Sequence, residues 1–196
     1  MNSISQSKPI SSFKRFTLER IVLIISMIFT IMTVTYFFTN FKNEEFKVLH
    51  KFVPNKWNFE TKISLLSIIS SWVGMLILFV MLYIASLRVI TDNASPIGNQ
   101  DSESIVFLNR ILTNTVEQTL IFLPNLACWT INYANEGNKH EVVAFGVLWM
   151  VGRVIFIIGY FIGLKIDFQI LRGFGLGLSV ISSFILVVRN LGFRLV

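Results

Sequence analysis

The chain has 196 residues, of which 54% are hydrophobic and only 14% are charged, with a mean hydropathy of +0.68. Soluble domains carry roughly 25% charged residues, so this composition excludes an ordinary soluble domain and indicates an integral membrane protein. The formal net charge is +6. Because Lys and Arg lie mostly in tails and loops, we attribute this charge to membrane-surface electrostatics rather than to nucleic-acid binding. The only cysteine in the sequence, Cys128, lies in an apolar stretch and is interpreted as a small packing residue.

The first part of the chain is predicted to be a tail followed by a membrane helix. Residues 1–17 are polar, basic and serine-rich, which is typical of a flexible tail. An apolar run follows at 21–38 and is long enough to cross the hydrocarbon core. A cleavable signal peptide is the rival interpretation, but no small residues suited to a cleavage site come after this run. We therefore expect a retained helix at 18–41 and a charged loop at 42–62.

Further apolar segments follow, and each is long enough for a membrane helix. They lie at about 63–87, 103–128, 142–164 and 171–188. The polar connection at 91–102 contains Pro96 and Gly98, as turns do. The expected fold is an all-α membrane protein in which an N-terminal helix is added to a four-helix unit at 63–192. Lys and Arg are nearly balanced between the two sides of these spans, so the positive-inside rule does not decide the orientation.

A group of polar residues stands inside the apolar segment at 103–128. Arg110, Asn114 and Glu117 are spaced i, i+4 and i+7, which places them on one face of a helix. A cation, an amide and a carboxylate at membrane depth are costly, and such residues usually face a bundle interior or a wet cavity. A structural explanation stays open, because Arg110 and Glu117 could pair through Asn114 as a clamp between helices.

A second polar stripe lies in the segment at 142–164. Arg153, Phe156 and Tyr160 are spaced i, i+3 and i+7, so they also share a face. If the spans alternate in direction, Tyr160 lies on the same side of the membrane as the group at 103–128, and Arg172 opens the next segment on that side too. We expect the following residues to line one pocket: Arg110, Asn114, Glu117, Arg153, Tyr160 and Arg172.

The glycine-rich run at 173–177 superficially matches a nucleotide-binding loop. It lacks a preceding strand, and in an apolar helix small residues more often permit close contact between helices. We therefore predict that this run lies at a helix crossing and binds no nucleotide.

These residues belong to a series of motifs that resembles the MAPEG family, the membrane-associated proteins of eicosanoid and glutathione metabolism. The motifs are R-x-x-x-N-x-x-E (Arg110, Asn114, Glu117), F-L-P (Phe122, Leu123, Pro124), W-x-x-G-R (Trp149, Gly152, Arg153), G-Y (Gly159, Tyr160) and R-G-F (Arg172, Gly173, Phe174). The resemblance covers about residues 63–192 in order and spacing. It implies a MAPEG-like four-helix transmembrane bundle, to which this chain adds one extra N-terminal transmembrane helix at 18–41.

The resemblance also implies a glutathione site in a homotrimer. Glutathione, as a co-substrate, would lie in clefts between neighbouring subunits that open to the cytoplasm, and the N-terminus would be cytoplasmic too. The positions that match glutathione-binding residues of the family are Arg110, Asn114, Glu117, Arg153 and Tyr160. Arg172 is the nearest match to the arginine that stabilises the thiolate, which makes it the candidate catalytic residue.

Physical chemistry agrees with these roles. Glutathione carries two carboxylates and an ammonium; arginine matches carboxylates bidentately, and Glu117 suits the ammonium. Catalysis needs the thiolate, since a free thiol with a pKa of about 8.5 is mostly protonated at neutral pH. An adjacent Arg172 would lower that pKa, and each unit corresponds to about 1.4 kcal/mol. The expected activity is that of a glutathione-dependent transferase or peroxidase acting on hydrophobic electrophiles.

Other functions stay open. Phe156 and Gln118 stand where some members of the family have tyrosine, so those hydroxyls are missing. Some relatives bind lipid without catalysis, which makes a non-enzymatic lipid-binding or scaffold protein the second hypothesis. A transporter or channel is disfavoured because the sequence lacks paired broken helices and repeated halves. We expect no metal site, since His50 and His140 lie in polar loops, far apart in the sequence, and lack metal-ligand spacing.

Overall fold

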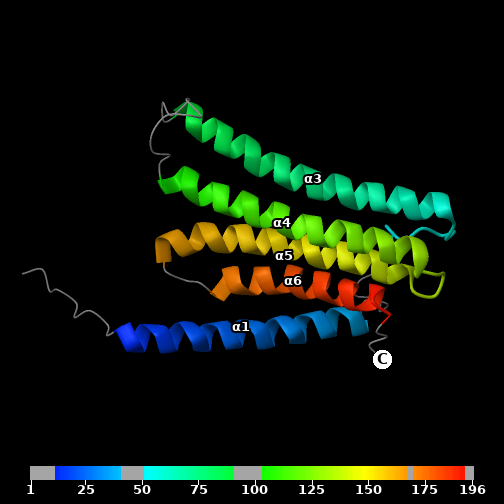
Figure 1. Ribbon diagram of the computed structural model, residues 1–196, viewed down its shortest axis with the longest axis horizontal. Coiled ribbons are helices and arrows are strands. Elements are labelled where there is room, and N and C mark those ends of the chain that lie inside the picture. The colour runs from blue at the N-terminus through cyan, green and yellow to red at the C-terminus, as the bar shows by residue number, and fades with distance from the viewer. Residues whose placement is uncertain (1–11, 41–50, 91–102, 167–169, 193–196) are drawn as a thin grey trace, which may run out of the picture.

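The computed structural model describes residues 12–40, 51–90, 103–166 and 170–192. Its helices are α1 (Ser12–Asn40), α3 (Phe59–Ile90), α4 (Glu103–Asn132), α5 (Lys139–Ile166) and α6 (Ile170–Asn190), as Figure 1 shows. Within these ranges there is no strand, so the all-α expectation is confirmed. The connection expected at 91–102, His50 and the first part of the predicted tail lie outside the described residues.

The observed helix boundaries extend most of the expected ones. α1 begins at Ser12, inside the predicted tail, and α3 begins at Phe59, inside the predicted loop. The start of α3 is fixed by reciprocal capping: Thr61 N donates to Asn58 Oδ1 at 2.9 Å, and Asn58 N donates to Thr61 Oγ1 at 3.0 Å. α4 continues through Pro124. A proline is tolerated there because neighbouring groups in a helical membrane protein can satisfy the freed carbonyl.

The helices differ in how well they qualify as membrane spans. Within the described residues, three are long and apolar enough to cross a membrane: α3, α5 over Lys139–Ile162, and α6 over Arg172–Asn190. α4 is long enough but is not among them, because polar residues distributed along it lower its hydropathy. The described apolar part of α1, Ile24–Asn40, is shorter than a typical span. That α1 and α4 cross the membrane stays a prediction.

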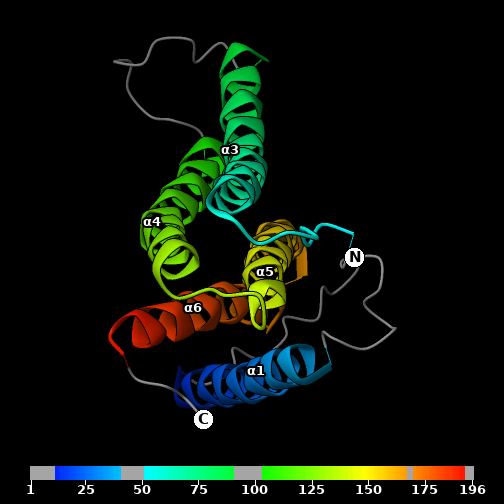
Figure 2. The ribbon, with the colours of Figure 1, turned by 90° about the vertical axis from the view of Figure 1, so that its right-hand side faces the viewer.

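α5 is the central helix of the bundle. In the 18-residue apolar stretch of each helix, 61% of α5 is buried inside the molecule, against 22% of α3. α5 packs most extensively on α6, while α3 packs mainly on α4. α1 lies along α6 on the side away from α3, as Figures 1 and 2 both show. The helices α3, α4, α5 and α6 thus pack against one another, and α1 lies along α6. That α3 to α6 form the expected four-helix unit, with α1 as an addition, stays a prediction.

Glycines set the distance between α6 and both of its neighbours. A Cβ added to Gly175 would lie 2.3 Å from the Phe156 backbone nitrogen, so the α5 and α6 backbones are in direct contact there. On the other side, a Cβ on Gly177 would lie 2.7 Å from Thr30 Oγ1 of α1. Real Cβ atoms do not approach other atoms so closely, so only glycine allows these helices to come this near. The prediction that the run at 173–177 lies at a helix crossing is therefore confirmed.

The guanidinium of Arg153 lies between two apolar clusters of the buried core. One apolar cluster contains Trp149 and Phe122, whose rings stack with centroids 4.9 Å apart. A second contains Phe156 and Ile111. Arg153 lies between them, with its guanidinium carbon 5.5 Å from the Trp149 ring centroid and 5.0 Å from that of Phe156. Packing against both rings offsets part of the cost of burying the charge.

Candidate functional site

An open pocket lies on the outer face of α4, near the end at which α5 finishes. It has a volume of about 590 Å³, within the usual range of about 300–1,000 Å³ for small-molecule sites. Its lining comes from α4, with Tyr160 contributed by α5: Val106, Asn109, Arg110, Thr113, Asn114, Glu117 and Tyr160. The structure thus brings Arg110, Asn114, Glu117 and Tyr160 together in one site.

Arg110 and Glu117 are exposed in the single chain. Neither has an ion-pair partner among the described residues, so the expected alternative of a clamp between these two side chains is not what the structure has. Hydrocarbon around two unpaired charges would cost several kcal/mol. This face of α4 is therefore suited to a wet cleft or to a covering protein surface.

Arg153 does not line the pocket; it lies behind it. Its side chain is fully buried, with 0% exposed. Its Nη1 donates to Asn114 Oδ1 of α4 at 2.8 Å, and its Nη2 donates to Ser179 Oγ of α6 at 2.6 Å. We call Asn114, Arg153 and Ser179 the polar layer, because they join three helices at one level between the two apolar clusters.

Ser179 is the member of this arrangement that the sequence did not reveal. α6 contains other serines, and Ser182 and Ser183 are also buried. All three hydroxyls contact carbonyl oxygens of α6 itself, which is the ordinary behaviour of serine in an apolar helix. The one available signal was that Ser179 lies seven residues after Arg172, on the same helix face.

Tyr160 connects the pocket to Arg172. The Arg172 guanidinium carbon lies 4.9 Å from the Tyr160 ring centroid, a cation–π distance. The same ring makes T-shaped contacts with Phe107, at 5.0 Å between centroids, and with Phe156, at 4.8 Å. Arg172 therefore adjoins the site through Tyr160. Phe156, where some relatives have tyrosine, is almost fully buried beneath the Arg153 guanidinium and does not line the pocket.

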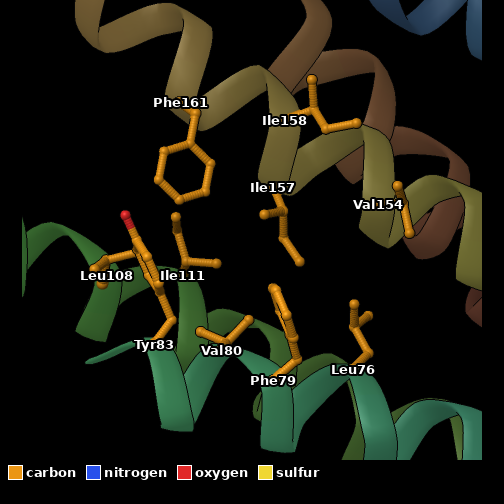
Figure 3. Close-up of a pocket in the computed structure, with 10 residues that line it drawn as sticks. All are labelled: Leu76, Phe79, Val80, Tyr83, Leu108, Ile111, Val154, Ile157, Ile158 and Phe161. Carbon is orange, nitrogen blue, oxygen red and sulfur yellow. The ribbon is translucent and has the colours of Figure 1, made fainter. Parts of the chain in front are cut away.

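A separate apolar cavity is lined by residues of α3, α4 and α5. It has a volume of about 180 Å³ and lies between α3 and α5, with α4 as its floor. Figure 3 shows Phe79 and Val80 of α3 pointing toward Ile157 and Phe161 of α5. Phe107 contacts both Phe161, which lines this cavity, and Tyr160, which lines the polar pocket. Aromatic contacts therefore link the apolar cavity to the polar site.

Two minor interpretations from the sequence need correction. Cys128 is exposed rather than packed inside the chain, because it lies on the same outward face of α4 as Glu117 and Pro124. His140 is the second residue of α5 and is partly buried, not part of a loop. In the part of the chain that the structure describes, no group of three or more His, Cys, Asp or Glu side chains could hold a metal ion.

The fold, with three helices able to span a bilayer, defines a helical integral membrane protein. The model of the MAPEG family matches residues 65–192, which is most of the chain and contains the whole candidate site. The chain belongs to the MAPEG family, so the resemblance found in its motifs is confirmed. No curated protein and no solved structure matches it.

Proposed function

We propose that this MAPEG protein binds glutathione in the pocket on α4 and conjugates it, through its sulfur, to hydrophobic electrophiles. The observation that carries the proposal is the grouping of Arg110, Asn114, Glu117 and Tyr160 around one open pocket, with Arg153 of α5 supplying a buried cation behind it. Members of the family include glutathione transferases. The particular activity proposed here rests on the charge and the geometry of the site.

The charges of the site suit glutathione. Arg110, Arg153 and Arg172 supply three cations near Glu117, which is the one carboxylate among the described residues that line the pocket. Glutathione in its thiolate form has two carboxylates, an ammonium and the thiolate, so it is a net anion. Arg110 is placed to pair with a carboxylate, and Glu117, about two helical turns away, is placed to accept from the ammonium.

Arg172 is the residue proposed to favour the thiolate. Its guanidinium lies on the Tyr160 ring at the edge of the pocket, where it would face the sulfur of a bound tripeptide. A positive charge at that position lowers the pKa of the thiol. The thiolate then attacks the electrophilic carbon, a sulfur–carbon bond forms, and the bond to the leaving group breaks with its electron pair. The apolar cavity beside Phe107 would hold the hydrophobic part of the electrophile.

We also propose that the working unit is a homotrimer. The exposed face of α4 continues below the pocket as an apolar stripe that includes Leu120 and Ile121, which are 69% and 46% exposed. Members of the family are often trimeric. A second copy covering this stripe would also cover Arg110 and Glu117 and remove their charges from lipid. The pocket would thereby become a cleft between subunits, open to the cytoplasm, and the N-terminus would be cytoplasmic as well.

A lipid-binding protein without catalysis is the second candidate. It is favoured by the apolar cavity, whose lining offers only aliphatic and aromatic side chains. This candidate predicts co-purifying lipid and no effect of glutathione on the stability of the protein.

The decisive experiment is a conjugation assay on the detergent-solubilised full chain. The electrophile is 1-chloro-2,4-dinitrobenzene, from which chloride leaves. It is held at a fixed, saturating concentration while glutathione is varied, and the wild type should show turnover. Arg110→Ala should raise the KM for glutathione because it removes a carboxylate contact. Arg172→Ala should mainly lower kcat because it removes the charge that favours the thiolate.

Lys51→Ala, in the loop before α3, is the matched control and should leave both constants unchanged. The wild type should also gain thermal stability when glutathione is added, as any ligand-binding protein does. A wild type with neither turnover nor a glutathione-dependent thermal shift would exclude the proposed function.

A further inference from the structure

In the polar layer, chemistry determines which group donates and which accepts in each hydrogen bond. A guanidinium can only donate, so the atom of Asn114 that contacts Arg153 must be the carbonyl oxygen Oδ1. Ser179 Oγ likewise accepts from Arg153, and its own proton is donated along α6 to the Leu176 carbonyl oxygen at 2.9 Å. Every hydrogen bond in the layer is thus assigned in one direction only.

The consequence at the pocket concerns the amide of Asn114. Because Oδ1 is engaged behind the pocket wall, the –NH2 group is the polar end of Asn114 that remains for the pocket that this residue lines. No hydrogen bond from Nδ2 to another described residue is found. At this position the site therefore offers donors and requires an acceptor on its ligand.

The burial of Arg153 is an electrostatic reason for the ligand atom at Asn114 to be an anionic acceptor. Arg153 is 0% exposed, has no carboxylate partner among the described residues, and its Nε is buried without a partner. A buried charge that lacks a counter-charge is costly, and its field acts over several ångströms in a medium of low dielectric. An anionic acceptor placed on Asn114 Nδ2 would reduce that cost.

We propose that Arg153 is a positioning residue: held by Ser179, it locks the Asn114 amide so that Nδ2 donates to a carboxylate or peptide carbonyl oxygen of the ligand. The inference rests on the proposed glutathione site and refines it. Arg153 acts through Asn114 and does not touch the ligand, contrary to what its place in the sequence motif suggests.

The first test is Asn114→Asp in the full chain. A carboxylate retains the contact with Arg153 and pairs with its charge, so the melting temperature should not fall. It replaces the donor at the pocket by an acceptor, so the Kd for glutathione, measured by titration calorimetry, should rise at least tenfold. Asn132→Asp adds the same charge to the same helix about 27 Å away and serves as the control. Unchanged affinity in Asn114→Asp would overturn the proposal.

The second test asks whether Arg153 works through Asn114. Ser179→Ala removes one acceptor of the guanidinium and should weaken glutathione binding several-fold in the wild type, but not further in an Asn114→Ala background. Ser182→Ala is the matched control, because its buried hydroxyl donates to the Leu178 carbonyl oxygen of its own helix and, among the described residues, to no other group. Equal losses from Ser179→Ala in both backgrounds would contradict the coupling.

A readout without ligand separates this inference from the proposed function. In ¹H–¹⁵N spectra, the side-chain amide signals of Asn114, identified by their loss in Asn114→Asp, should shift in Ser179→Ala and remain in place in Ser182→Ala. That result would support the layer even if the wild type bound no glutathione, which would exclude only the proposed function. Amide signals that do not respond to Ser179→Ala would overturn the layer while leaving a glutathione site intact.

Discussion

At the scale of single residues, the site combines exposed and buried charges with different roles. Arg110 and Glu117 are exposed and have no ion-pair partner in the described part of the chain, which leaves them available to a ligand. Arg153 is inaccessible and acts on the pocket wall. Substitutions of these residues should therefore differ in kind, because removing an exposed charge affects the ligand and removing a buried one affects the protein as well.

Glu117→Gln should weaken glutathione binding selectively. The substitution preserves shape and removes the charge that would accept from the ligand's ammonium, and a hydrogen bond to a charged group contributes about 1.5–3 kcal/mol, or roughly 10–100-fold in Kd. Titration calorimetry of the two proteins measures this ratio. Glu60→Gln, in the first turn of α3, is the control for loss of a carboxylate elsewhere.

The ligand itself provides a second control for Glu117. N-acetylated glutathione lacks the ammonium, so it should bind the wild type and Glu117→Gln with similar affinity. A variant that loses affinity equally for both ligands would show that Glu117 has another role, such as holding the pocket in shape.

At the scale of helices, the closeness of α5 and α6 determines whether the polar layer can form. Gly152 and Gly175 face each other: a Cβ on Gly152 would lie 2.9 Å from Ser179 N, and one on Gly175 would lie 2.7 Å from Gly152 O. Larger residues would separate the two backbones and increase the distance between Arg153 and Ser179. The glycines are thus a precondition for the layer that orients Asn114.

Gly175→Ala should lower the melting temperature of the detergent-solubilised protein and weaken glutathione binding together. The added Cβ would overlap backbone atoms of Phe156, which cannot move aside as a flexible side chain can, and such overpacking costs about 1–3 kcal/mol. Gly74→Ala is the matched control: no atom lies within 4 Å of its added Cβ, so it should be neutral or slightly stabilising. Equal melting temperatures for Gly175→Ala and the wild type would contradict the close crossing.

Features of the fold and site that lie within one helix could be predicted from the sequence, whereas contacts between different helices could not. Helix positions followed from apolar length, and the shared face of Arg110, Asn114 and Glu117 followed from spacing within one helix. Spacing does not tell which neighbouring helix covers a face, so Arg153 was expected at the ligand and lies behind Asn114. For the same reason the sequence could not tell that Cys128, interpreted as a small packing residue, is exposed in the single chain.

At the scale of the whole molecule, the isolated chain leaves much of its apolar surface open. Lipid covers such surface without difficulty, but the exposed face of α4 mixes that surface with charges, which lipid does not cover well. The chain therefore has one face whose composition favours a protein neighbour, and this face contains the pocket.

Leu120→Trp should dissociate the proposed trimer and, with it, abolish glutathione binding. The larger side chain is tolerated by lipid but would hold two closely packed helices apart. Native mass spectrometry in detergent reports the number of subunits. Ile28→Trp is the control, because Ile28 is 54% exposed on α1, which lies outside residues 65–192 that match the family. A Leu120→Trp protein that remains trimeric would place the interface on a different face.

The polar layer also restrains how far the helices can slide along one another. Displacing α5 by one turn, about 5.4 Å, relative to α4 or α6 would withdraw the Arg153 guanidinium from Asn114 or Ser179 and leave it surrounded by apolar side chains. Apolar clusters alone tolerate such shifts far better, because one aliphatic contact can replace another. The three side chains thus fix the axial register of α4, α5 and α6, and with it the depth at which each would sit in the bilayer.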